Sequence, residues 1–504
     1  MGLSALSLIV PFSVILMVVF TKRVALSLFI GILVSAVLMH SLHLSQLVEY
    51  IYHKITSVFY TYEPEKGLHF NLSNLYVFGF LIFLGVLSQV ILKSGSVQNF
   101  VKKAKKYSKN AKTPEFIAFF SGIIIFVDDY FNALTVGQIS KSLNDAHNST
   151  RERLAYIIDS TSAPVCLLVP ISSWGAYIMG IMNNDSSPLL KDSFSVLVQS
   201  LSSNYYAIFA LIAVFLTILW QINLPSMRKY QNIGVKDFYS EQEESSSKLA
   251  PLSLLPLSIL LLIVSISSLL FYTAVILKNT DASFSLFYGG LFSLIVTYLL
   301  AYKFLEKGSF FKLMLDGFKS VGPAILVLTL AWAIGPVIRD DAQTGLYLAH
   351  ISKEFLNHGG GAYMPLIFFL ISGFIAFSTG TSWGAFAIML PIGAGMANES
   401  DIILIVSAIL SGAVYGDHTS PISDTTILSA TGAGCSVQSH FITQLPYATI
   451  AMLCSAVSLG VASFMHSRSL ALVIGVALLV GVFYLLKRFY GEKSKNLNID
   501  LSKA

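Results

Sequence analysis

Runs of about 20 mostly apolar residues recur along the whole of this 504-residue chain. A transmembrane helix needs roughly 20 such residues, because it must cross about 30 Å of hydrocarbon. The composition agrees: 55% of the residues are hydrophobic and 12% are charged, whereas a soluble domain carries roughly 25% charged residues. The sequence therefore predicts an all-α polytopic membrane protein that has the lipid bilayer as its partner.

Acidic and other polar residues interrupt four of these apolar regions. The interruptions are Asp128-Asp129 in 114–140, Asp159–Pro164 and Pro170–Gly175 in 154–182, Ser378–Gly384 in 363–397, and Asp417–Asp424 in 402–434. A carboxylate at the bilayer centre costs several kcal/mol and usually faces a cavity or an ion path. Irregular backbone at that depth is tolerated only where it is buried in protein or lines water. We predict re-entrant hairpins at about 114–140 and 363–397, and broken transmembrane helices at about 154–182 and 402–434.

The two halves of the chain resemble each other. Ser121–Phe126 matches Ser372–Phe377 at an offset of 372 − 121 = 251, and Asp159–Pro164 matches Asp417–Pro421. Five crossings and one hairpin in each half would invert the second half, a recurring plan of secondary transporters. The predicted parts are a first inverted repeat at 1–222, a cytoplasmic linker at 223–250, a second inverted repeat at 251–465, and a last helix with a basic tail at 466–504.

Basic residues gather in particular loops. The segment 93–112 holds seven lysines and no acid, and the C-terminal tail is also basic. Cytoplasmic loops carry an excess of Lys and Arg. We expect a periplasmic or extracellular N-terminus and a cytoplasmic C-terminus. The apolar N-terminus has no basic residue ahead of it, so it is interpreted as a first span rather than a cleaved signal peptide.

The adjacent carboxylates Asp128 and Asp129 point to different faces of a helix, so one of them is expected to reach a site. Two neighbouring carboxylates in a low dielectric disfavour a second charge, so one can hold a proton near neutral pH. A cation that binds there displaces the proton, which is the simplest basis for cation–proton exchange. The structural alternative is that they cap a helix or pair with a cytoplasmic Lys.

Asp159, Asp417 and Asp424 lie in or beside predicted helix breaks. Hard cations prefer oxygen ligands, so we predict an ion and proton site here, with sodium at Asp159 and Asp417. The predicted supporting ligands are Asn132, Ser160, Thr161, Thr379, His418, Thr419 and Ser420. The alternative is structural, because Ser and Thr can bond to helix carbonyls and Asp can cap a helix.

His418 has an ordinary pKa near 6.5 and could carry a proton, or it could be a satisfied hydrogen-bonding residue. Two further islands, Ser173-Trp174 and Ser382-Trp383, are each followed by Gly-Ala. They would contact a small organic solute or form close-packed helix crossings, where small residues are common.

Other function classes find no support in the sequence. No Walker-type phosphate loop occurs, which argues against ATP-driven transport, and no nucleophile–base arrangement indicates an enzyme. No second His or Cys lies at metal-ligand spacing. We expect no cofactor beyond sodium ions and protons, and no nucleic-acid partner.

Four motifs together resemble the NhaC family of sodium/proton antiporters, in the wider ion-transporter superfamily. They are Phe126–Asn132, Asp159–Val165, Ser172–Ala176 and Gly416–Thr426. The resemblance implies a multi-pass protein of the bacterial cytoplasmic (inner) membrane that exchanges sodium for protons by alternating access. The family also holds organic-acid exchangers and amino-acid carriers, so a coupled carrier of a small carboxylate or amino acid stays an alternative. A homodimer is also left open.

Overall fold

The computed structural model describes residues 5–21, 23–40, 43–63, 67–96, 99, 112–146, 149–184, 187–231, 250–251, 253–273, 283–306, 308–343, 347, 360–421 and 423–491. Most of the linker predicted at 223–250, five of the seven lysines in 93–112 and the tail after 491 lie outside these ranges. The described part of the chain is mostly helical, as predicted.

The first half contains two short 3-10 helices and eleven α-helices among its described residues. These are η1 (Ala5–Leu8), α1 (Ile9–Thr21), α2 (Val24–His40), α3 (Leu44–Thr56), α4 (Leu72–Lys93), α6 (Lys112–Ile124), α7 (Asp129–Ala146), α8 (Arg151–Leu168), α9 (Ser173–Asn183), η2 (Pro188–Leu190), α10 (Ser193–Leu201), α11 (Tyr205–Trp220) and α12 (Pro225–Gln231).

The described elements of the second half are all helices. Its elements are α13 (Leu254–Phe271), α14 (Ser283–Ala301), η4 (Tyr302–Phe304), α15 (Phe310–Pro336), the π-helical η5 (Val337–Asp341), η6 (Gly360–Tyr363), α18 (Met364–Thr379), α19 (Ser382–Met396), α20 (Ile402–His418), α21 (Asp424–Ala433), α22 (Val437–Met465) and α23 (Arg468–Tyr490).

The helices confirm a multi-pass membrane protein. Six helices in the described residues are long and apolar enough to cross a membrane, or up to eight if each of two bent pairs is one span. Four shorter apolar helices of 10–17 residues accompany them. The larger number of crossings expected from the sequence, their inverted arrangement and the domain boundaries stay predictions.

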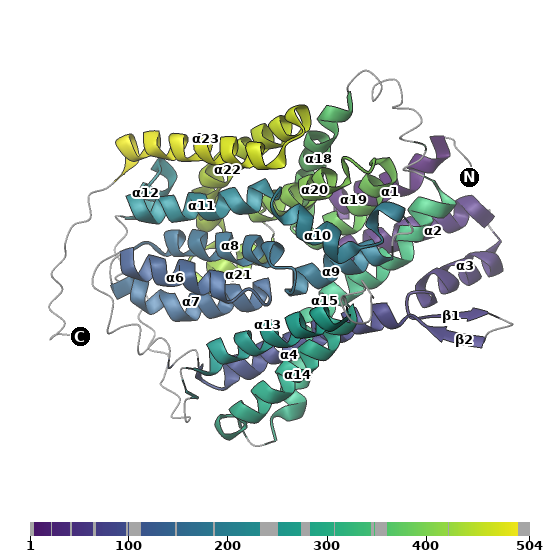
Figure 1. Cartoon of the computed structure of the whole chain (residues 1–504), viewed down its shortest axis with the longest axis horizontal. Helices are drawn as coiled ribbons and strands as arrows, with labels where there is room; N and C mark the ends of the chain where they lie inside the picture. The colour runs from purple at the N-terminus through teal and green to yellow at the C-terminus, as the bar shows by residue number, and fades with distance from the viewer. Residues whose placement is uncertain are drawn as a thin grey trace.

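Figure 1 shows the helices in neighbouring groups. The helices α4, α13, α14 and α15 form one group, in which α14 and α15 both pack on α4. On the other side, α11, α22 and α23 pack together. Between the two groups lie α8 and α21, both in contact with α7, and the closely packed pair α18 and α20 lies at the right-hand end of α22. Most of the acidic residues singled out in the sequence lie on α7, α8, α20 and α21.

The segment 43–72, which was predicted only as a polar stretch, has structure of its own. The helix α3 is followed by a two-stranded antiparallel sheet, β1 (Tyr60–Glu63) and β2 (Gly67–Phe70). The helix is held to η5, because Tyr50 donates a hydrogen bond to Asp341 and Lys54 forms a 2.7 Å ion pair with the same carboxylate. Burial and this carboxylate raise the pKa of Tyr50 above its ordinary value.

Each predicted hairpin consists of two packed helices joined by a short irregular segment. The first is α6 and α7, separated by residues 125–128, and the second is α18 and α19, separated by Gly380 and Thr381. Gly380 has a left-handed backbone with φ of 69°, which glycine adopts without steric cost. The changes of direction therefore occur at Asp128 and at Gly380, where the sequence predicted them.

Of the two interruptions predicted in 154–182, the one at Asp159–Pro164 is wrong and the one at Pro170–Gly175 is confirmed. The helix α8 runs without interruption through Asp159 and Pro164, and the chain breaks only at 169–172, where α8 and α9 meet at 43°. Ser162 Oγ donates to Asp159 O, and Asn132 Nδ2 donates to Thr161 O. These donors bond to the carbonyls on either side of Ser160 O, which is the acceptor whose backbone partner Pro164 removes, and the helix continues past the proline. The break between α20 and α21 at Pro421 is confirmed.

A buried ion pair joins the ends of three helices. Arg153 on α8 contacts Glu115 on α6 at 2.7 Å, and both side chains are nearly inaccessible. The remaining donors of Arg153 go to Thr217 O, Ile222 O and Asn223 Oδ1, at the end of α11. Ser149 and Gln221 donate to the Glu115 carboxylate. Every charged atom thus has partners, as a buried pair requires.

Candidate functional site

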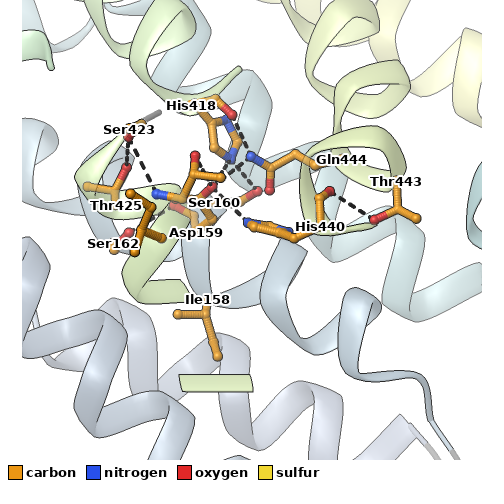
Figure 2. Close-up of polar contacts among 12 residues, drawn as sticks. Ile158, Asp159, Ser160, Ser162, His418, Ser423, Thr425, His440, Thr443 and Gln444 are labelled. Carbon is orange, nitrogen blue, oxygen red and sulfur yellow. Dashed lines mark hydrogen bonds and ion pairs between the residues drawn. The ribbon is translucent and has the colours of Figure 1, made fainter. Parts of the chain in front are cut away.

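Asp159 lies at the centre of a buried polar cluster in the middle of α8 (Figure 2). Its side chain is 0% exposed. Its Oδ2 accepts hydrogen bonds from His440 Nε2 at 3.1 Å and from Gln444 Nε2 at 2.7 Å, both on α22. Its Oδ1 has no partner among the described residues. One oxygen of this carboxylate is therefore held in place while the other is unpaired.

His418 lies beside this carboxylate at the end of α20. Its Nε2 is 4.0 Å from Asp159 Oδ2 and 3.1 Å from Ser160 Oγ, while its Nδ1 is 2.6 Å from Tyr206 OH on α11. Both ring nitrogens thus have hydrogen-bond partners. This agrees with the alternative interpretation of the sequence, in which His418 is a satisfied hydrogen-bonding residue. Its role as a proton carrier stays a prediction.

Asp417 precedes His418, but its carboxylate is held by a separate set of residues. Ser423 donates to Oδ1, and the backbone N–H and hydroxyl of Ser382 donate to Oδ2 at 3.2 and 2.9 Å. Ser382 begins α19 and Ser423 caps α21. Two helix N-termini, which carry partial positive charge, therefore stabilise negative charge on Asp417.

Asp128 has a closely similar environment in the first half. Its Oδ1 accepts from Phe131 N at 3.1 Å, the geometry of an N-cap for α7, and its Oδ2 accepts from Ser173 Oγ at 3.0 Å. Ser173 begins α9, just as Ser382 begins α19. Each Ser-Trp-Gly-Ala island thus places its serine on a carboxylate. The proposed capping role of Asp128 is seen, and its role in ion binding stays a prediction.

Asp129 differs from all of these carboxylates. It is 0% exposed, and neither of its oxygens has a hydrogen-bond partner in the described part of the chain. Asp128, Asp417 and the indole of Trp174 are among the groups that act on its charge. The structure thus brings carboxylates from both halves of the chain into one region.

The predicted supporting residues mostly bond to backbone. Thr161, Thr379 and Thr419 donate to carbonyls one turn earlier in their own helices, and Ser420 donates to Phe377 O. Asn132 Nδ2 donates to Gly122 O, Ile125 O and Thr161 O, which ties the first hairpin to α8. Asp424 is exposed at the start of α21, where Tyr130 OH donates to it at 3.2 Å.

The two tryptophan islands meet. The rings of Trp174 and Trp383 lie 5.6 Å apart, and Tyr177 OH donates to Trp383 O at 2.9 Å. Both tryptophans are buried, and the hydroxyls of Ser173 and Ser382 are engaged by carboxylates. In this conformation the islands form a close helix contact. A contact with an organic solute stays a prediction.

Sequence reasoning did not identify several residues of these clusters: Tyr206, Ser423, Thr426, His440 and Gln444. The available signal was a polar stripe on α22, where His440, Thr443 and Gln444 follow at helical spacing inside an apolar run. Tyr206 gave no such signal, because a tyrosine in an apolar helix is common.

Comparison with known proteins places the chain in a family. Residues 165–464 match the model of the Na+/H+ antiporter family. The chain belongs to the Na+/H+ antiporter family. The match runs from the last residues of α8 to α22, so it includes Asp417, His440 and Gln444. Membership in the Na+/H+ antiporter family confirms the NhaC-type resemblance and supports a transporter coupled to sodium and protons, rather than an enzyme.

Two relatives and one solved structure are similar to this chain. An uncharacterized protein of Haemophilus influenzae is 33% identical over 508 residues, covering 96% of each chain. A malate-2H(+)/Na(+)-lactate antiporter of Bacillus subtilis is 31% identical over 153 residues, or 28% of this chain and 30% of the relative. The crystal structure of the YdaH transporter of Alcanivorax borkumensis is 13% identical, with a TM-score of 0.49, over 85% of this chain and 91% of that one.

Proposed function

We propose that this protein exchanges sodium ions for protons across the cytoplasmic membrane by alternating access. The observation that carries the proposal is Asp159, a fully buried carboxylate with one oxygen held by His440 and Gln444 and the other unpaired. A buried carboxylate needs a proton, a cation or donors to compensate its charge. The groups near Asp159 Oδ2 are the amide of Gln444, the hydroxyl of Thr426 and the imidazoles of His418 and His440. Among the described residues, no Lys or Arg pairs with this carboxylate.

Sodium and a proton compete for the Asp159 carboxylate, and this competition couples the movement of one to the movement of the other. A metal ion binds the deprotonated form, so binding of sodium releases a proton and protonation releases sodium. No group of three or more His, Cys, Asp or Glu side chains in the described residues is arranged as a metal centre. A transported sodium ion would therefore draw its ligands from Asp159 together with amide, hydroxyl or carbonyl oxygens, and from Asp417 nearby.

The broken elements beside the site are suited to alternating access. The break between α20 and α21 lies directly after Asp417 and His418, and α9 and α19 each begin at a serine that donates to a carboxylate. Discontinuous helices meeting at an ion site recur in secondary transporters, where one part rocks against another. Movement of these ends would expose the carboxylates to one side at a time.

The experiment is a sodium pulse applied to proteoliposomes that contain a trapped pH dye and no organic solute. Inward sodium movement coupled to outward proton movement should make the interior alkaline beyond empty liposomes. Asp417→Asn, which keeps the shape of the side chain, should abolish this signal while the protein is expressed and inserted. Full exchange activity in the Asp417→Asn variant would show that Asp417 is not needed for the exchange of sodium and protons.

The second candidate is a sodium- or proton-coupled carrier of a small carboxylate or amino acid. It is favoured by the partial similarity to a malate-2H(+)/Na(+)-lactate antiporter. The same assay separates the two functions. A flat trace with sodium alone, followed by proton movement when malate or lactate is added, would support the carrier. Alkalinisation with sodium alone would support the antiporter.

A further inference from the structure

The small sheet formed by β1 and β2 has one apolar face and one polar face. Residues paired across the strands share a face, and successive side chains point to opposite faces, so the apolar face consists of Tyr60, Tyr62, Leu68 and Phe70. Tyr62 is 70% exposed, and Leu68 and Phe70 are exposed as well. The other face carries Thr61 and His69, which are also exposed. Large apolar side chains of this sheet are therefore left uncovered by the described residues.

The helix α3 extends this apolar surface. Residues spaced by four are neighbours on a helix, and an exposed apolar stripe of this spacing runs along α3 at Leu44, Val48 and Tyr52. The hydroxyls of Tyr52 and Tyr60 are 3.0 Å apart, which places the stripe beside the sheet. Exposed Glu49 and His53 lie on another side of the helix, where they pair at 3.7 Å. The stripe and the apolar side of the sheet together form one surface, the α3–sheet face.

Bonds to the membrane helices fix the α3–sheet face in position. Asn74 Nδ2 on α4 donates to Val58 O, just before β1, at 2.8 Å. On the other side of the face, the ion pair between Lys54 and Asp341 holds α3 to η5. None of the residues of α3 is buried. The face is therefore presented by ordered elements that are attached at both sides, and it is not a side of a packed core.

The α3–sheet face lies where two apolar helices reach the end of the molecule. The helix α2 ends at His40, shortly before α3, and α4, which is long enough to cross a membrane, begins at Leu72, shortly after β2. Figure 1 shows α3, β1 and β2 together at this end of the molecule. Exposed apolar residues continue from the face onto both helices, at Leu38 and Met39 on α2 and at Leu72 on α4. Since exposed apolar residues of membrane helices face lipid, the α3–sheet face is continuous with the lipid-facing surface.

The composition of the α3–sheet face suits the surface of a bilayer. Three of its side chains are tyrosines, Tyr52, Tyr60 and Tyr62. Tyrosine is enriched at membrane–water interfaces, where its ring is buried and its hydroxyl stays hydrated. The face is small for a stable protein interface, to which each partner contributes about 20–30 residues. An amphipathic helix lies in the bilayer interface with its apolar side buried among headgroups and acyl chains. We propose that α3 and the β1–β2 sheet form an interfacial anchor, whose α3–sheet face inserts among the phospholipid headgroups and adjoining acyl chains.

The two faces of strand β1 provide a matched comparison. In the full-length protein with its three cysteines replaced by alanine, a nitrobenzoxadiazole dye would be attached through Tyr62→Cys on the α3–sheet face or through Thr61→Cys on the opposite face. Each protein would be placed in phosphatidylcholine nanodiscs that hold one chain, with and without lipid carrying a nitroxide at the headgroup. The dye at Tyr62→Cys should emit at a shorter wavelength and be quenched about twofold more strongly by the nitroxide lipid, because an inserted face contacts the headgroups. The dye at Thr61→Cys should be quenched more strongly by aqueous iodide.

Equal responses of the two dyes to both quenchers would overturn the anchor, because an inserted face must differ from its opposite. A wavelength shift that appears only when each nanodisc holds two chains would assign the face to a second copy of the chain, and would likewise overturn it. The wild-type protein gives an independent measurement that needs no variant to fold. A phospholipid with a photoactivated diazirine near its headgroup should label Tyr62 or Phe70 and leave Thr61 and His69 unlabelled. Labelling confined to other elements of the protein would contradict the anchor.

Discussion

At the residue scale, the buried carboxylates differ by what donates to them. Asp128 and Asp417 lie at helix N-termini and accept bonds from serine hydroxyls and backbone N–H groups. Asp159 accepts from His440 and Gln444, and Asp129 accepts from nothing in the described residues. These identical side chains therefore have different environments, and the charge of a carboxylate inside a protein depends on its partners.

His440→Ala tests the contribution of α22 to the Asp159 site. The change removes a donor at 3.1 Å from Oδ2, and a hydrogen bond to a charged group contributes about 1.5–3 kcal/mol. The initial rate of sodium-driven proton movement in proteoliposomes should therefore fall about tenfold or more.

Thr443→Val is the matched control for that change. Thr443 is buried on the same helix, but its hydroxyl donates only to Ser439 O and His440 O. Because this bond stays within the helix, the exchange rate should remain within about twofold of the wild type. Equal losses in both variants would show that α22 acts through packing rather than through His440.

At the element scale, close helix contacts hold the broken helices in place. Gly412 and Gly416 on α20 face the backbone of α18, and a Cβ on Gly416 would lie 2.0 Å from Gly373 O. Small residues allow such close approach between membrane helices. The position of Asp417, which follows Gly416 directly, therefore depends on this crossing.

Gly416→Ala should force α18 and α20 apart. Overpacking of this kind costs about 1–3 kcal/mol, so the melting temperature of the detergent-purified protein should fall, and exchange should fall with it. Gly460→Ala is the control, because a Cβ there meets nothing within 4 Å. An unchanged melting temperature in Gly416→Ala would contradict the crossing seen here.

Arg153→Met tests the buried pair that ties α8 to α6 and α11. Removal of one partner leaves the Glu115 charge buried without its counter-ion, which costs about 3–5 kcal/mol. The purified variant should melt well below the wild type. The double variant Glu115→Leu, Arg153→Met removes both charges and should lose less stability than Arg153→Met alone. The opposite order would show that the hydrogen bonds of Glu115 to Ser149 and Gln221 outweigh the cost of its unpaired charge.

At the scale of the whole molecule, the orientation in the membrane follows from the charge of the loops. We expect a cytoplasmic C-terminus and an N-terminus on the opposite side, because Lys and Arg are retained on the cytoplasmic side. A green fluorescent protein fused to the C-terminus should fluoresce, while alkaline phosphatase fused there should be inactive. Active phosphatase at the C-terminus would contradict this orientation.

Much of the architecture could be predicted from local sequence. Long apolar runs predict membrane helices, because the bilayer leaves few other ways to satisfy the backbone. The interruptions near Asp128, in Ser378–Gly384 and near Pro421 were likewise predicted, since polar residues, glycine or proline mark each one. The continuous helix through Pro164 was not predicted, because the sequence alone does not show how the neighbouring helices pack around α8.

The sequence by itself therefore determined that the chain is a multi-pass helical membrane protein with carboxylates inside it, and which motifs carry them. Only the tertiary structure decided how the carboxylates are grouped. It paired Asp159 with His440 and Gln444, which are 281 and 285 residues away, and left Asp129 without donors. The physical reason is that apolarity and helix breaks are local properties, whereas the compensation of a buried charge depends on whichever helices pack around it.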